Sequence, residues 1–201
     1  MDNEELTLFR DMAHRALEAE ISPYIEQWEA QHSVPRELWH TLGQAGLLCP
    51  DMPEEYGAAG TTPEVTFAVI EEMSRLSFGG IASGYSIHSN IVAPYIEHFG
   101  TEEQKSQWLP KMVTGEALGA LAMTEPSAGS DVQSIRTKAV KDGDEWILNG
   151  SKIFITNGML ADIVIVAAIT DPGKGAKGTS LFIVDATLPG FARGKKIEKM
   201  G

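Results

Sequence analysis

A run of small and hydroxylated residues near the middle of the chain is the best candidate for chemistry. The segment Ala122–Ser134 reads AMTEPSAGSDVQS. The small side chains of Ala128 and Gly129 allow a ligand to come close to the backbone N–H groups. Thr124 and Ser130 add hydroxyl groups. The segment suits an anionic or heteroaromatic ligand, and a structured turn between two domains is an equally good interpretation.

Three other patterns carry less chemistry. The run Gly173–Gly178 has the G-x-G-x-x-G spacing, but a predicted strand follows it, whereas a dinucleotide-binding turn opens a helix. We interpret it as a flexible loop between strands. The five histidines lack the spacing of metal ligands. Cys49 precedes a proline and has no neighbouring base to ionise its thiol, so neither a metal site nor thiol catalysis is expected.

The first part of the chain must position this segment through helices. Apolar spacing and capping residues predict helices over 4–20, from Pro35 to about Gly43, from Thr61 or Thr62 onward, and from Thr101, where TEEQ forms a capping box. The Pro/Gly-rich stretch 49–62 should be a loop. In 77–100, three glycines favour a loop, while apolar residues favour a buried helix from about residue 82.

The pattern changes near Ala117. Asp142-Gly143 and Asn149-Gly150 are both typical of two-residue hairpin turns. Strands are predicted over 145–148, 152–156, 163–169 and 181–184, which are rich in β-branched residues. The fold class is therefore α+β. An all-α N-terminal domain, residues 1–116, precedes an antiparallel, β-barrel-like middle domain, residues 117–201.

Composition excludes several classes of protein. The 201 residues carry 16 Lys+Arg against 28 Asp+Glu, a net charge of −12, so neither a nucleic acid nor an anionic membrane surface is an expected partner. Hydrophobic residues make up 43%, enough for a packed core, and the single cysteine excludes an intrachain disulfide. No apolar run approaches the ~18 residues of a membrane span, and the acidic start lacks a targeting pattern. We expect a soluble, cytoplasmic protein.

The 122–134 segment resembles the signature of the acyl-CoA dehydrogenases at every fixed position of that signature. Residues 144–158, DEWILNGSKIFITNG, resemble the family's second conserved stretch, and 53–57, 100–105 and 108–110 are also similar. The resemblance covers essentially the whole chain and is strongest to the long-chain branch. It implies a helical domain, a middle β domain that is incomplete here, and a C-terminal helical bundle that lies beyond Gly201 and is absent from this sequence.

The resemblance also implies a cofactor, FAD. The residues expected to contact it are Leu121, Ala122, Met123, Thr124, Gly129, Ser130, Phe154, Ile155 and Thr156. Thr124 would bond the pyrimidine edge of the flavin, and the Thr156 hydroxyl would lie near N5. Ser130 would also meet the acyl-CoA substrate. Many members of the family carry Trp where this chain has Phe154.

The implied activity is α,β-dehydrogenation of a fatty acyl-CoA, with hydride passing to flavin N5. The family's catalytic base is a glutamate of the C-terminal domain, expected beyond Gly201, so no catalytic residue is assigned and the chain alone should be inactive. Glu125 is interpreted as stabilising its turn. The implied partners are an electron-transferring flavoprotein and further copies in a dimer or tetramer. The alternatives are an acyl-CoA oxidase or flavin monooxygenase relative, and a non-catalytic module that binds acyl-CoA or a partner.

Overall fold

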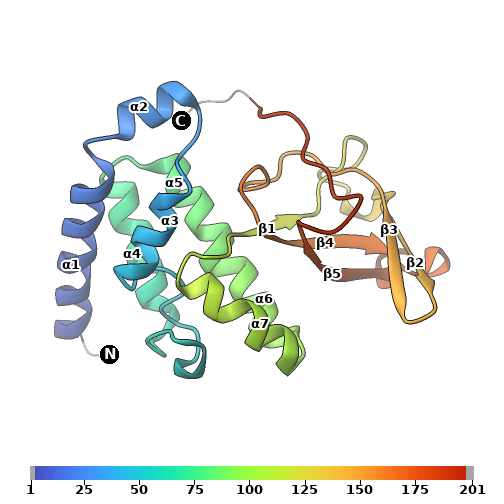
Figure 1. Ribbon diagram of the computed structural model, residues 1–201, viewed down its shortest axis with the longest axis horizontal. Helices are drawn as coiled ribbons and strands as arrows, with labels where there is room; N and C mark the ends of the chain where they lie inside the picture. The colour runs from blue at the N-terminus through green and yellow to red at the C-terminus, as the bar shows by residue number, and fades with distance from the viewer. Residues whose placement is uncertain (1–2, 198–201) are drawn as a thin grey trace. The chain divides into compact units, whose positions relative to one another are not determined.

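The computed structural model describes residues 3–197, which divide into two units, with the boundary along the chain between Gly119 and Ala120 (Figure 1). The first unit is helical, and the second is built on strands. In the first unit the α-helices are α1 Asn3–Ile21, α2 Ile25–Gln31, α3 Glu37–Gln44, α4 Pro63–Arg75, α5 Gly79–Tyr85, α6 Ala93–Phe99 and α7 Glu102–Val113. A π-helical segment, Ser86–Val92, joins α5 to α6, and Glu54–Tyr56 forms a short 3₁₀ turn.

Capping and burial explain the helices that the sequence predicts. At the start of α7, Gln104 N donates to Thr101 Oγ1 at 3.3 Å and Thr101 N donates to Gln104 Oε1 at 2.9 Å, which confirms the capping box. Helix α4 begins at Pro63, where the missing N–H costs little. Leu17 of α1 and Met73 of α4 are fully buried, and these two helices pack against each other.

The stretch 77–100 is helical throughout most of its length, so the loop interpretation of its glycines is wrong. Gly79 and Gly80 open α5, whose Ile81 and Tyr85 are buried in the core. Burial of these side chains outweighs the low helix propensity of glycine. The sequence also gives no signal for α2, which buries none of its residues.

His88, in the π-helical segment, fixes where the chain leaves the helical unit. Its Nε2 lies 3.0 Å from Met112 O at the end of α7, and Gly119 N donates to its Nδ1 at 3.1 Å. The ring is fully buried. The segment that enters the first strand is therefore tied to the last helix by a histidine side chain.

The strand unit is a mixed, open sheet. Its strands are β1 Gly119–Ala122, β2 Lys138–Asp142, β3 Glu145–Asn149, β4 Ile163–Ile169 and β5 Thr179–Asp185, in the order β1-β4-β2-β3 with β5 also paired to β4. The pairs β2–β3 and β4–β5 are antiparallel, as predicted. However, β2 and β4 are parallel, meeting at Lys138 and Ile169, and the described strands do not close into a barrel.

The predicted strand over 152–156 is absent, and this explains the parallel pair. Phe154 has φ 59° and Asn157 has φ 65°, both in the left-handed region, so the backbone turns here. The connection 150–162 brings the chain back, and β4 then runs in the same direction as β2. Of the two predicted hairpin turns, the one at Gly143 (φ 61°) joins β2 to β3, whereas no hairpin forms at Gly150.

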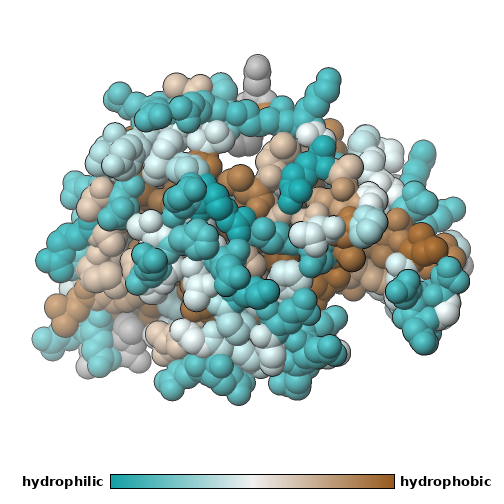
Figure 2. All heavy atoms as spheres, in the orientation of Figure 1, coloured by the Kyte–Doolittle hydropathy of each residue, from teal (hydrophilic) through white to brown (hydrophobic). Residues whose placement is uncertain are grey.

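The remaining predictions concern loops and surfaces. The run Gly173–Gly178 lies between β4 and β5, as predicted, in short 3₁₀ turns. No helix within residues 3–197 is long and apolar enough to cross a membrane. In the strand unit, apolar surface gathers over the β2–β3 hairpin (right in Figure 2), where Val140, Trp146 and Ile147 are exposed.

Candidate functional site

The two segments that the sequence singles out lie side by side in the strand unit. Ile153 N donates to Thr124 O at 2.9 Å, so the end of the β1 segment and the start of the 153–156 segment share a backbone hydrogen bond. One residue earlier in each segment, Lys152 Nζ donates to Met123 O at 3.0 Å. Leu121–Thr124 and Phe154–Thr156 are therefore held next to each other.

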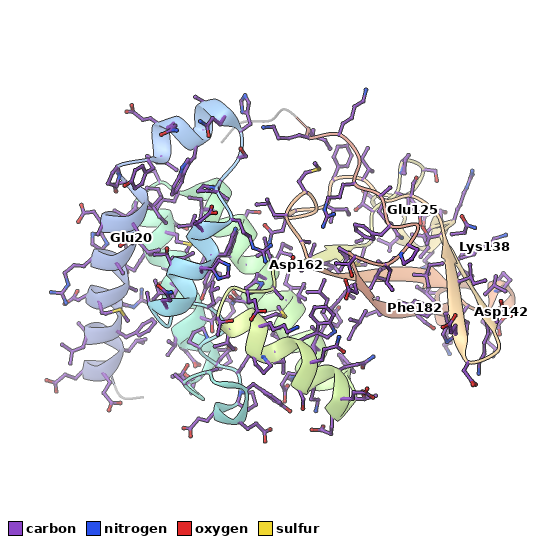
Figure 3. The ribbon with its side chains drawn as sticks, viewed as in Figure 1. Glu20, Glu125, Lys138, Asp142, Asp162 and Phe182 are labelled. Carbon is purple, nitrogen blue, oxygen red and sulfur yellow. The ribbon has the colours of Figure 1, made fainter. Side chains whose placement is uncertain are left out.

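A buried ion pair lies at this junction. The Glu125 side chain is 4% exposed and the Lys152 side chain is 10% exposed, with Nζ 2.9 Å from Oε1. Arg136 N donates to Glu125 Oε2 at 2.6 Å, while Thr137 donates to Oε1 through its N–H at 2.9 Å and its hydroxyl at 2.5 Å. Figure 3 shows Glu125 near the end of the β2–β3 hairpin that carries Lys138, away from Asp142 at the turn.

These donors keep Glu125 ionised. Burial alone would raise the pKa of Glu125, but hydrogen bonds from the Thr137 hydroxyl, the Lys152 ammonium and the N–H groups of Arg136 and Thr137 outweigh it and lower the pKa to about 2. A carboxylate that accepts four hydrogen bonds and resists protonation is a poor general base. The structure thus agrees with a structural role for Glu125.

Small residues support the two segments from behind. Ala120 and Ala122 of β1 form a buried cluster with Ala161 and Val164, against which Ile155 packs. Met123 packs against a second cluster formed by Ala128, Ile135 and Ala167. The alanines allow the segments to lie close to β4, so the positions of Met123 and Ile155 are set by the sheet.

The groups that could meet a ligand remain available. Thr124 and Thr156 are partly buried, and within residues 3–197 their hydroxyls have no hydrogen-bond partner. Gly129 and Ser130 are exposed, and in the same part of the chain their N–H groups have no acceptor. Phe154 is 68% exposed in spite of its aromatic ring. The site therefore offers two hydroxyl groups, two backbone donors and an aromatic ring.

A shallow hollow adjoins the ion pair. Its volume is about 290 Å³, and its lining residues are Glu125, Pro126, Ser127, Arg136, Thr137, Gly150 and Ser151. Within the signature turn, Glu125 N donates to Ala128 O at 2.9 Å and Ala128 N donates to Glu125 O at 3.1 Å. The turn is thus closed by two hydrogen bonds of its own backbone.

Comparisons with known proteins identify the family. A family model described as "Acyl-CoA dehydrogenase, N-terminal domain" matches residues 3–116, and one described as "Acyl-CoA dehydrogenase, middle domain" matches residues 120–201. The chain belongs to the acyl-CoA dehydrogenase family. The family resemblance seen in the sequence is therefore confirmed.

Individual members of the acyl-CoA dehydrogenase family match over nearly the whole chain. The mitochondrial long-chain specific acyl-CoA dehydrogenase of Rattus norvegicus is 46% identical over 199 residues, 98% of this chain and 46% of the relative. The acyl-CoA dehydrogenase from Geobacillus kaustophilus has a TM-score of 0.94 and 45% identity, covering 99% of this chain and 52% of that one. A glutaryl-CoA dehydrogenase from Mycobacterium smegmatis in complex with FADH2 has a TM-score of 0.89 and 32% identity, covering 99% and 50%. The chain spans about half the length of these acyl-CoA dehydrogenases.

The structure brings together most of the residues that the acyl-CoA dehydrogenase resemblance assigns to FAD. Those at 121–124 and 154–156 form one junction, and Gly129 and Ser130 follow on the exposed side of the closed turn. Sequence reasoning missed Lys152 and Thr137. The sequence shows a cation, Lys152, within the second family stretch and an acid, Glu125, within the first, but nothing in it pairs the two.

Two side chains that can carry chemistry lie outside this junction and do not add to it. Cys49, in the helical unit, is fully buried, and burial raises the pKa of its thiol to about 12, so the thiolate is not formed at neutral pH. His88 is committed to backbone groups. Among residues 3–197 no three His, Cys, Asp or Glu side chains come together as metal ligands would.

Proposed function

We propose that this chain forms the flavin-facing part of an FAD-dependent acyl-CoA dehydrogenase that acts on a fatty acyl-CoA. The observation that carries the proposal is the Ile153 N–H to Thr124 O hydrogen bond, which joins the family's two conserved stretches into one surface. The shared identity with the long-chain dehydrogenase of Rattus norvegicus supports a fatty acyl substrate.

The residues present fit a flavin. Free hydroxyls at Thr124 and Thr156 could donate to ring heteroatoms, and free N–H groups at Gly129 and Ser130 suit phosphate oxygens. The exposed ring of Phe154 could cover an aromatic face, although it lacks the N–H that tryptophan offers in many relatives. When bound, FAD supplies the acceptor for the hydride that leaves the β-carbon of the acyl chain.

The residues of this chain would orient a bound flavin ring and stabilise the charge that develops on it. Fixed hydroxyl and N–H donors stabilise negative charge that develops on a bound ring without having to reorganise. With a flavin ring bound against them, Phe154 and Ile155 would exclude water from the ring, which would strengthen those hydrogen bonds. Removal of the α-proton needs a carboxylate whose pKa lies nearer neutrality than that of Glu125, so Glu125 is not assigned as the base. We assign the base to the half of the relatives' length that this chain does not span, and we expect the chain alone to be inactive.

The test is a flavin titration followed by substrate. Saturable FAD binding to the 201-residue chain, weakened by Thr124→Ala with Thr170→Ala as the matched control, is the expected result. Thr170 is also partly buried in the strand unit but bonds within the β4–β5 hairpin. No FAD binding would overturn a cofactor site made by these residues. Anaerobic addition of a long-chain acyl-CoA should leave the flavin band unbleached, and bleaching would refute the assignment of the base.

Binding and turnover measurements also distinguish the two alternative functions. A chain that binds acyl-CoA but no flavin would be a binding module. In a protein that spans the full length of the relatives and contains this chain, turnover with oxygen in place of an electron-transferring flavoprotein would indicate an oxidase or monooxygenase relative. Assembly as a dimer or tetramer and a cytoplasmic location also belong to the proposal, and light scattering and cell fractionation test them.

A further inference from the structure

We propose that Glu125 and Lys152 are a positioning pair, which sets the spacing between the Thr124 and Thr156 hydroxyls on the two sides of the cofactor site. The inference rests on the proposed function for the role of those hydroxyls. Neither Glu125 nor Lys152 is expected to touch the cofactor or the substrate. They act through the two segments to which they belong.

Lys152 holds Thr124 from both sides. Its ammonium donates to Met123 O at 3.0 Å and to Glu125 Oε1 at 2.9 Å, so the residues before and after Thr124 are bound by one cation. The next residue of the second segment, Ile153, donates its N–H to Thr124 O at 2.9 Å. Three consecutive residues of the first segment are therefore bonded to two consecutive residues of the second.

Glu125 anchors this arrangement to the sheet. Its carboxylate accepts from Arg136 N and from both donors of Thr137, the residue directly before β2. Thr137 O in turn accepts from Ile169 N at 2.8 Å, at the end of β4. The contacts run without a break from the Thr124 backbone through the ion pair to β2 and β4, so the backbone that carries the Thr124 hydroxyl is held by strands of the sheet.

The burial of Glu125 and Lys152 makes the pair specific for one register, that is, for one alignment of the two segments along each other. Both side chains are at least nine-tenths buried, so either charge without the other would remain desolvated and unpaired. A shift of one segment along the other would break the Lys152 contacts to Met123 O and Glu125 together. Gly150 supports the same register, because a Cβ there would lie 2.2 Å from Thr137 Oγ1. The pair thus selects one alignment of the two segments.

The experiment compares Lys152→Met, Lys152→Arg and Thr137→Val with the unsubstituted 201-residue chain. Hydrogen exchange at the Ile153 amide reports the contact between the segments, and amides of the β4–β5 hairpin report the fold of the unit. We expect Lys152→Met to lower protection at Ile153 by about tenfold or more and to leave the hairpin protected. Lys152→Arg, which keeps the cation, should retain most of the protection at Ile153. Thr137→Val, which removes one hydrogen-bond donor to Glu125, should lower this protection by less than Lys152→Met does.

FAD affinity is measured on the same variants. Lys152→Met should weaken binding by about tenfold, with Lys152→Arg intermediate. The matched control is Glu72→Gln in the helical unit. Glu72 is also buried and paired, with Arg10 Nη1 and Arg75 Nη1 each at 3.3 Å. This control should leave both Ile153 protection and FAD affinity unchanged.

The outcomes separate the two proposals. If the unsubstituted chain does not bind FAD, the proposed function fails, while hydrogen exchange still decides whether the pair sets the register. If Ile153 stays protected in Lys152→Met, the positioning role is overturned. It is also overturned if Ile153 and the hairpin lose protection equally, because the pair then only stabilises the unit. Should Lys152→Met fail to fold, the protection at Ile153 and in the hairpin is compared in Thr137→Val instead, which removes one uncharged hydroxyl group.

Discussion

The ionisation of Glu125 predicts how the stability of the strand unit depends on pH. The folded-state pKa of about 2 lies below the ordinary value of 4.5, so folding favours the ionised carboxylate. The stabilisation is therefore complete above about pH 5 and is lost as the pH falls through about 2. In Glu125→Gln this contribution should be missing at every pH.

The size of the effect follows from the two values. A fall from 4.5 to about 2, at about 1.4 kcal/mol per pH unit, corresponds to about 3 kcal/mol at pH 7. Glu125→Gln should lower the free energy of unfolding of the strand unit by about this amount, since Lys152 then remains buried without a counter-charge. The gap between the two proteins should close on acidification, because the parent loses the same contribution.

Hydrogen exchange in the β4–β5 hairpin measures this gap for the strand unit alone, across a series from pH 7 to pH 3. Glu103→Gln, at an exposed position on α7, is the control and should change stability by less than about 0.5 kcal/mol. A gap between parent and Glu125→Gln that stays constant from pH 7 to pH 3 would refute the reasoning. So would an NMR titration of Glu125 with a midpoint at or above the ordinary value.

Three further predictions concern single positions. Gly150→Ala should destabilise the strand unit by about 1–3 kcal/mol in urea unfolding, because its Cβ would lie 2.7 Å from Thr137 Cα, whereas Gly194→Ala, with nothing within 4 Å, should be neutral. Thr101→Ala should cost about 1 kcal/mol through loss of the α7 cap, and an unchanged urea midpoint would contradict the capping argument. Cys49 should react with a thiol reagent only on unfolding, since burial raises its pKa to about 12, and rapid labelling of the native protein at pH 8 would show that it is accessible.

Local signals in the sequence predicted the parts of the fold that depend on local interactions. The capping box at Thr101 depends on residues three apart, and the turn at Gly143 depends on one left-handed glycine, so both could be predicted from the sequence. The prediction of a strand over 152–156 was wrong because β-branched residues are typical of buried positions as well as of extended backbone. Ile155 is used to pack on the β1 cluster from a turn.

Long-range contacts explain the rest. The parallel alignment of β2 with β4 depends on the path of the connection 150–162, for which local patterns carry no signal. The candidate site residues could be proposed from the family signature, whereas the ion pair that joins the two stretches could not. Glu125 and Lys152 are 27 residues apart, and only the folded structure shows that the two charges face each other.

The backbone at Phe154 has a consequence for binding. An aromatic residue at φ 59° costs about 1–2 kcal/mol relative to an ordinary conformation. It persists because the neighbouring Ile153 N–H is bonded to Thr124 O and because Gly158 N donates to Ile155 O at 3.0 Å. The chain has therefore lost the conformational entropy of this turn during folding, before any ligand arrives. A flat molecule that stacks on the ring would find a surface already in its bound shape and could keep more of its contact energy as affinity.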